Sequence, residues 1–172
     1  MPLVSHPRLH VTSTNLAAVK ARLGTGGVWE PDFQTWVDWA DGQYATALSE
    51  SLANLIFLAA DYAFLYMTHG VTGASYGHTQ AQYGTLARDI LIEISVQSSV
   101  VGNYDWYGVP LAYDWCHPLL SGGDKTTLVT LMKTIDDFDL DPPTASAFDS
   151  QVTVGRCQAL LSALAFADDG VD

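Results

Sequence analysis

The chain has 172 residues and a formal net charge of −12, with only seven Lys and Arg residues. Hydrophobic residues make up 48% and charged residues 15%, which indicates a folded domain with a real core and excludes a disordered chain. Nucleic-acid binding depends on neutralising phosphates, so the charge argues against that class of protein. No apolar run reaches the about 18 to 20 uninterrupted residues of a membrane span, so no membrane partner is expected.

Capping residues and apolar spacing predict four helices in the first half of the chain. Thr12–Asn15 offers N-cap oxygens to a helix that Gly24 ends, and a second helix begins around Pro31. The third helix, residues 49–68, is apolar almost all round and must be covered on several sides. The fourth, residues 78–96, has one apolar stripe, so the two form a hairpin of an inner and an outer helix.

The second half repeats this pattern after a loop. A fifth helix is predicted over residues 105–120 and a sixth over 124–138, with Asp124 as its cap. A seventh, largely apolar helix is predicted over residues 148–167. This last inner helix has no outer partner, so we interpret the chain as the N-terminal part of a longer array. Another chain covering the open hairpin is the alternative.

A Leu-Ala step recurs at Leu58, Leu111 and Leu164, each time 53 residues apart and inside an apolar run. Such self-similarity is typical of repeats in which no single copy buries its own face. We therefore expect a single all-α domain, residues 1–172, of stacked helical hairpins that form an incomplete (α/α) toroid.

Asp61 and Asp114 occupy equivalent positions in this repeat. The equivalence favours a structural role, in which each carboxylate binds an adjacent loop or a neighbouring Arg. The alternative is a pair of catalytic carboxylates in a glycosidase, which requires two carboxyl groups about 5 to 10 Å apart.

The two cysteines, Cys116 and Cys157, lie in predicted helices. We expect buried thiols that behave as small hydrophobes, and a disulfide between neighbouring hairpins is the alternative in a secreted protein. The sequence has no CxxC pair, HExxH motif, phosphate loop or dinucleotide fingerprint, so no metal centre and no cofactor are predicted.

Several segments together resemble the heparinase II/III-like and alginate-lyase-like polysaccharide lyases. The segments are His6–Leu9, the helix end Lys20–Leu23, Leu111–Trp115 with the following Leu119–Ser121, and Phe148–Gly170. The resemblance implies an incomplete (α/α) toroid that is followed by a β-sandwich domain. It also implies a polysaccharide or oligosaccharide partner, β-elimination on uronate polymers and an extracellular or periplasmic location, although the acidic composition suits many cytoplasmic proteins too.

In such lyases a polar side chain neutralises the uronate carboxylate, and Tyr or His residues move the protons. The neutralising Asn often precedes the helix that matches 148–170, where this chain has Asp149, Ser150 and Gln151. A carboxylate there would repel a uronate, so Gln151 is the candidate neutral donor. His117 is a candidate acid or base, and a His that faces a loop is the alternative. The family's other catalytic His and Tyr residues generally lie further along than residue 172.

An aromatic and polar loop precedes the predicted fifth helix. We expect it to contact sugar rings, and packing at one end of the toroid is the alternative. The same two interpretations apply to Trp29 and Trp36. A non-catalytic helical repeat that binds glycans or assembles with other chains is therefore the second function to consider. The loop consists of Asn103, Tyr104, Asp105, Trp106 and Tyr107.

Overall fold

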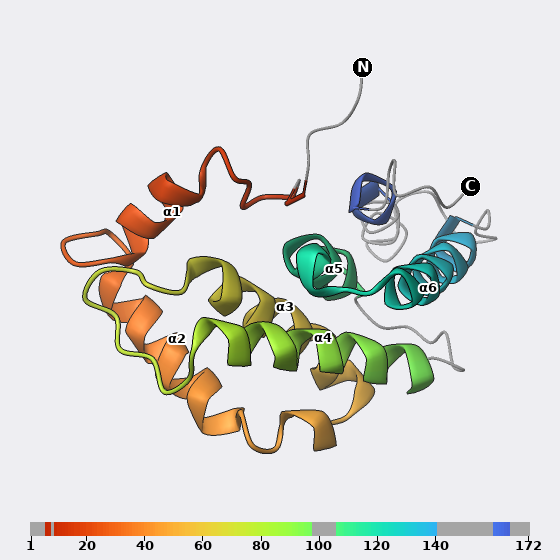
Figure 1. The fold of residues 1–172 in the computed structure, drawn as a ribbon, viewed down its shortest axis with the longest axis horizontal. Coiled ribbons are helices and arrows are strands. Elements are labelled where there is room, and N and C mark those ends of the chain that lie inside the picture. Colours follow the sequence, from red (N-terminus) through yellow and green to blue (C-terminus); the bar gives the residue numbers. More distant parts are fainter. Residues whose placement is uncertain (1–5, 8, 98–105, 141–159, 166–172) are drawn as a thin grey trace, which may run out of the picture.

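The computed structural model describes residues 6–7, 9–97, 106–140 and 160–165, with the backbone alone for residues 135–140. Every regular element in these residues is helical, which confirms the all-α prediction (Figure 1). None of the described helices combines the length and the hydrophobicity of a membrane-spanning segment. The elements are α1 (Leu16–Leu23), α2 (Glu30–Gln43), η1 (Ala47–Ser49), α3 (Leu52–Thr68), α4 (Gln80–Gln97), α5 (Gly108–Cys116), η2 (His117–Leu119) and α6 (Gly122–Leu140), and residues 160–165 are also helical.

Helix α3 is the central element of the fold. It packs against α4 along its length and against α5, while α1 and α2 contact it as well (Figure 1). Its buried residues include Leu55, Ile56, Ala59, Tyr62 and Leu65, which point in several directions around the helix. The prediction that this helix needs covering on several sides is confirmed. The arrangement of the helical hairpins as an incomplete (α/α) toroid stays a prediction.

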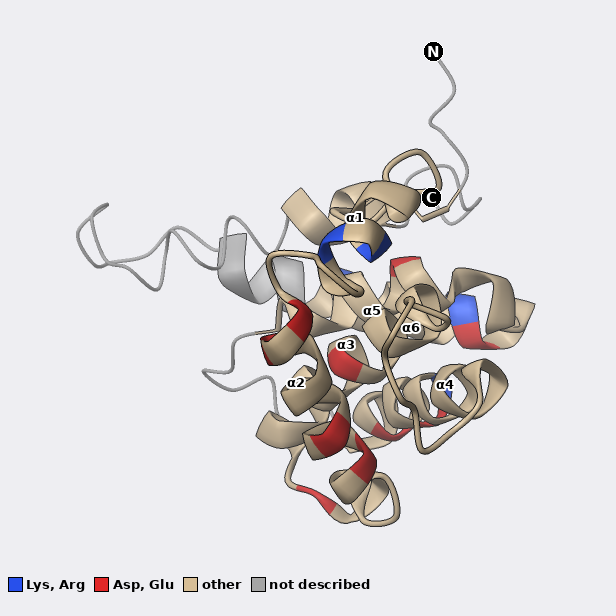
Figure 2. Ribbon diagram, turned by 90° about the vertical axis from the view of Figure 1, so that its left-hand side faces the viewer, with Lys and Arg blue, Asp and Glu red and all other residues tan. Residues whose placement is uncertain are grey.

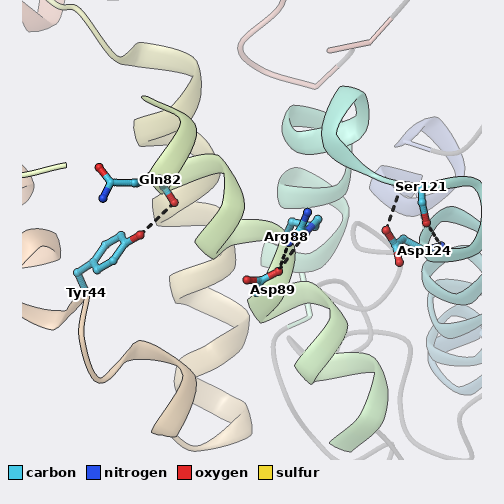
Figure 3. Close-up of polar contacts among 6 residues, drawn as sticks. All are labelled: Tyr44, Gln82, Arg88, Asp89, Ser121 and Asp124. Atoms are coloured by element: carbon cyan, nitrogen blue, oxygen red, sulfur yellow. Dashed lines mark hydrogen bonds and ion pairs between the residues drawn. The ribbon is translucent and has the colours of Figure 1, made fainter. Parts of the chain in front are cut away.

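Local capping explains why two helices start where they do. Glu50 is extended, and the Ser51 side chain caps α3 by accepting a hydrogen bond from the Asn54 N–H, so the helix begins three residues later than predicted. At α6, Ser121 N–H donates to Asp124 Oδ2 at 2.9 Å and Asp124 N–H donates to Ser121 Oγ at 3.1 Å (Figure 3). This reciprocal capping box starts the helix at Gly122, so Asp124 is inside the first turn rather than at the N-cap.

Helix α5 is shorter than the predicted span of 105–120. It ends at Cys116 and continues as the 3₁₀ turn η2, which contains Pro118. Proline cannot donate the next helical hydrogen bond, and its ring opposes a regular helix at that point. Cys116 is buried, and burial raises the pKa of its thiol to about 12. Cys157 lies outside the described residues.

The repeated Leu-Ala step is buried in its first two copies, on α3 and on α5, where Ala59 and Ala112 are fully buried. In the third copy Ala165 is fully buried but Leu164 is 45% exposed. The alanine is fully buried in all three copies, and the third leucine departs from the pattern.

The beginning of α5 approaches the α3 backbone very closely. A Cβ atom added at Gly108 would lie 2.1 Å from the carbonyl oxygen of Ile56. Backbone cannot move aside as a flexible side chain can, so this contact requires glycine.

We predict that Gly108→Ala destabilises the protein by about 2 kcal/mol or more, because α5 must shift away from α3. The matched control is Gly42→Ala in α2, where an added Cβ meets nothing within 4 Å. Since alanine favours helix over glycine, the control should stabilise the protein by about 0.5 to 1 kcal/mol. Urea unfolding of both variants measures the difference, and equal stabilities would contradict the close approach.

Candidate functional site

A hollow of about 470 Å³ opens between α2, α3 and α5. Its walls are mainly aromatic and aliphatic, and two carboxylates lie among them. We call it the first hollow. The residues that line it are Leu23, Trp29, Asp32, Phe33, Trp36, Ala60, Asp61, Phe64, Tyr107, Leu111 and Trp115.

The rings of this hollow are held by contacts with one another. The Trp36 and Phe64 rings lie 5.5 Å apart edge to face, and the Phe64 and Trp115 rings lie 5.6 Å apart. These separations are typical of favourable aromatic pairs. At the rim, Trp29 is 54% exposed and Tyr107 is 39% exposed, so both rings offer a face to a ligand.

Asp61 is the partly buried carboxyl group of the first hollow. Its pKa is raised from 3.8 to about 6 because burial disfavours the charged form, while a hydrogen bond from the Trp36 side chain opposes the rise. A carboxyl group with this pKa accepts hydrogen bonds at neutral pH and donates one when it is protonated in mildly acidic solution.

The hollow has an acidic character. Asp32 and Asp61 are its only charged residues, and no Lys, Arg or His lines it among the residues that the structure describes. Figure 2 shows acidic residues on α2 and α3 and basic residues on α1. The arrangement suits a ligand with an apolar face and hydroxyl or ammonium donors, since no basic group is present to pair with an anion.

The structure places the predicted site residues in different surroundings. Tyr107, Trp29 and Trp36 come together in the first hollow. Trp106 is only 2% exposed, so its ring packs in the core and offers no face to a ligand. His117 lies in η2, at the end of α5. Four further predicted residues lie outside the described part of the chain, namely Asn103, Tyr104, Asp105 and Gln151.

His117 belongs to a second cluster, centred on the buried Asp114. The His117 ring stacks on the His6 ring at 3.6 Å, and His6 Nδ1 lies 2.5 Å from Asp114 Oδ1. The Leu9 N–H donates to Asp114 Oδ2 at 2.7 Å, and Trp115 Nε1 donates to the Leu9 carbonyl oxygen at 2.9 Å. Two adjacent residues of α5 therefore hold the N-terminal segment.

This cluster decides the role of the two equivalent aspartates. Asp114 is fully buried and binds an adjacent segment, which confirms its structural interpretation. Asp61 occupies the same position in the repeat but faces an open hollow. The two aspartates are therefore equivalent in the sequence repeat but lie in different environments.

A third group of rings surrounds His78, which lies just before the start of α4. His78 stacks on Tyr44 at 3.6 Å, and the Tyr44 hydroxyl donates to the Gln82 carbonyl oxygen at 3.3 Å (Figure 3). The Tyr83 hydroxyl donates to Asp41, and burial raises the pKa of Tyr83 above its usual range. These contacts tie the end of α2 to the start of α4.

Sequence reasoning missed part of the first hollow, including Asp32, Phe64 and Trp115. A signal was nevertheless present, because Trp29, Asp32 and Trp36 are spaced three and four positions apart. This spacing places them on one face of a helix. Trp115 could not be found in this way, since its place depends on how α5 packs against α3.

No family model matches the chain, and no curated protein or solved structure matches it either. Within the described residues, no group of three or more His, Cys, Asp or Glu side chains could hold a metal ion.

We predict that Asp114→Asn destabilises the protein by about 2 to 4 kcal/mol, because one of two buried acceptor oxygens becomes a donor. The control is Asp89→Asn, which removes an exposed ion pair with Arg88 (Figure 3) and should cost less than about 1 kcal/mol. Chemical unfolding measures both variants. A loss for Asp114→Asn no larger than that of the control would contradict the anchoring role.

We predict that Asp61→Asn gains stability relative to the wild type as the pH rises. The raised pKa means that ionising Asp61 costs folding free energy, and this cost is absent below pH 3.8 and fully present above about pH 6. Between pH 5 and pH 8 the difference in unfolding free energy should grow by about 1 kcal/mol, allowing for partial exposure. Asn54→Ala, which removes no titratable group, is the control. A difference that stays flat with pH for Asp61→Asn would refute the prediction.

Proposed function

We propose that this chain binds carbohydrate in the first hollow, as a helical domain of a carbohydrate-active protein. The observation that carries the proposal is the combination of exposed aromatic faces, those of Trp29 and Tyr107, with two carboxylates in one hollow. Sugar rings present apolar C–H faces and a rim of hydroxyl donors, so they need both kinds of group.

The geometry supports this function in more detail. Trp29 and Tyr107 provide rigid ring faces at the rim, and rigid aromatic side chains lose little conformational entropy when they bind. Asp61 and Asp32 provide acceptors for hydroxyl groups. A hollow of about 470 Å³ lies within the ordinary range of small-molecule sites.

The proposal includes the toroid that the sequence resemblance implies. Helices α3 and α4 form one hairpin around the central core, and α5 with α6 forms the next (Figure 1). Within such an array the first hollow lies between the inner helices α3 and α5 and the preceding α2. An extracellular or periplasmic location belongs to the same proposal.

A second candidate function is that of a polysaccharide lyase acting on uronate polymers by β-elimination. The observation that favours it is the grouping of His6, His117 and Tyr113, whose rings lie within about 6 Å of one another. The resemblance assigns proton transfer to these residue types, and Gln151 would be the neutralising donor. Glycan binding ranks first, because Tyr113 and Asp114 are fully buried and Asp114 holds the N-terminal segment.

We predict that Trp29→Ala weakens the binding of an oligosaccharide about tenfold, because one stacking face is lost. The matched control is the adjacent Val28→Ala, which changes a residue that is 81% exposed and does not line the hollow. Isothermal titration with oligomers of glucose, glucosamine and mannuronate gives the affinities. Absence of binding to every oligomer would overturn the proposed function.

The lyase candidate has its own readout. Incubation with alginate should raise the ultraviolet absorbance of unsaturated uronate, and His117→Ala should abolish the rise. If binding is measured without any such rise, this chain binds the polymer without catalysing β-elimination on it.

A further inference from the structure

A second hollow, of about 320 Å³, lies between the other halves of α2 and α3. Two aromatic rings line it, those of Trp39 and Phe57, which are 47% and 40% exposed. The remaining lining residues are Gln43, Glu50, Asn54 and Leu58. The second hollow therefore resembles the first in setting aromatic rings beside a carboxylate, and it adds two side-chain amides, those of Gln43 and Asn54.

The two hollows follow the same face of α2. Trp29, Asp32 and Trp36 line the first hollow, and Trp39 and Gln43 line the second. Successive members of this series are three or four positions apart, so they form one stripe along the helix.

Residues of α3 also form one stripe that lines both hollows. Along α3 the chain passes the second hollow before the first, which is the reverse of the order along α2. Phe64 and Asp61 line the first hollow, and Phe57 and Asn54 line the second. These residues also recur at three and four positions, and the stripe from Asn54 to Phe64 is about 15 Å long. Two facing stripes that run past each other make one groove, with the hollows as its two halves.

The halves meet at an aromatic contact. Phe57 lines the second hollow and Tyr107 the first, and their rings lie 5.7 Å apart in a T-shaped arrangement. Among the described residues, the exposed aromatic side chains are Trp29, Trp39, Phe57 and Tyr107. All four line this groove, although exposed aromatic rings could have been scattered over the surface.

Three carboxylates lie along the groove, those of Asp32, Glu50 and Asp61. Asn54 Nδ2 donates to Glu50 Oε2 at 2.8 Å, which holds that carboxylate at the edge of the second hollow. No Lys, Arg or His lines either hollow within the described part of the chain. The groove therefore attracts cationic donors and repels anions.

We propose that the two hollows are consecutive subsites of one groove that binds an oligosaccharide of amino sugars. This inference rests on the proposed carbohydrate binding and adds the length and the charge of the ligand. Aromatic rings stack on successive sugar units, and the ammonium groups of glucosamine units face the carboxylates. An apolar helix laid in the groove would remove those carboxylates from water and supply no cation to pair with their charge, which is costly, so an oligosaccharide of amino sugars is the better occupant.

The test compares glucosamine oligomers of two and five units by isothermal titration near neutral pH, where Asp61 is largely ionised. The wild type should bind the five-unit oligomer at least about tenfold more tightly than the two-unit oligomer, because a second subsite is filled. Trp39→Ala should remove most of that gain and leave the affinity for the two-unit oligomer nearly unchanged. Leu48→Ala, at a residue that is 45% exposed and lines neither hollow, is the control and should behave as the wild type.

Charge selectivity is measured with the five-unit oligomers of N-acetylglucosamine and of mannuronate. Both should bind at least about fivefold more weakly than the glucosamine oligomer, and Glu50→Gln should reduce this preference. Equal binding of the mannuronate oligomer would overturn the assignment to amino sugars.

The remaining outcomes separate the inference from the proposed function. Suppose that Trp29→Ala weakens binding while Trp39→Ala leaves the affinity for the five-unit oligomer unchanged. That result would support carbohydrate binding in the first hollow and contradict the second subsite. If no oligomer binds the wild type, both the proposed carbohydrate binding and the second subsite are contradicted. A dimer in sedimentation that Trp39→Ala dissociates, without oligosaccharide binding, would identify a second copy of the chain as the occupant and overturn the inference.

Discussion

The buried carboxylate of Asp114 is the constraint on which the arrangement of the described helices around the groove depends. It accepts a hydrogen bond from the Leu9 N–H, contacts His6, and lies on the helix whose next residue, Trp115, binds the Leu9 carbonyl oxygen. Trp115 also forms part of the groove wall through its contact with Phe64. Two adjacent residues of α5 therefore hold the N-terminal segment, and one of them, Trp115, also lines the first hollow.

Helix α3 connects this anchor to the groove. Its apolar faces pack against α4 and α5, and Gly108 lets α5 come close enough to contact the α3 backbone. The remaining stripe of α3, which carries Asn54, Phe57 and Asp61, then faces the groove beside α2. Because a buried helix supplies this stripe, its side chains are held in place without a ligand, which would limit the entropic cost of the binding that we propose.

Much of the fold could be predicted from local sequence signals, since capping residues and apolar spacing act over a few positions. Helix α1 has the predicted end, and α4 differs from the prediction by one or two residues. The site was only partly predictable. Trp106 and Tyr107 are neighbours in one aromatic loop, yet one is in the core and the other lines the groove. Which ring points inward is decided by the packing of α5 on α3, a contact between distant segments. The different surroundings of Asp61 and Asp114 have the same origin.

If the face between α2 and α3 is a carbohydrate-binding groove, as we propose, the indole N–H signals of the five tryptophans report on the bound sugar. In a ¹H–¹⁵N spectrum recorded while a five-unit glucosamine oligomer is added, the signals of Trp29, Trp36 and Trp39 should shift in a saturable way. The signal of Trp106, which is in the core, should stay in place. Unchanged signals for all three groove tryptophans, or a shift confined to Trp106, would contradict the proposal.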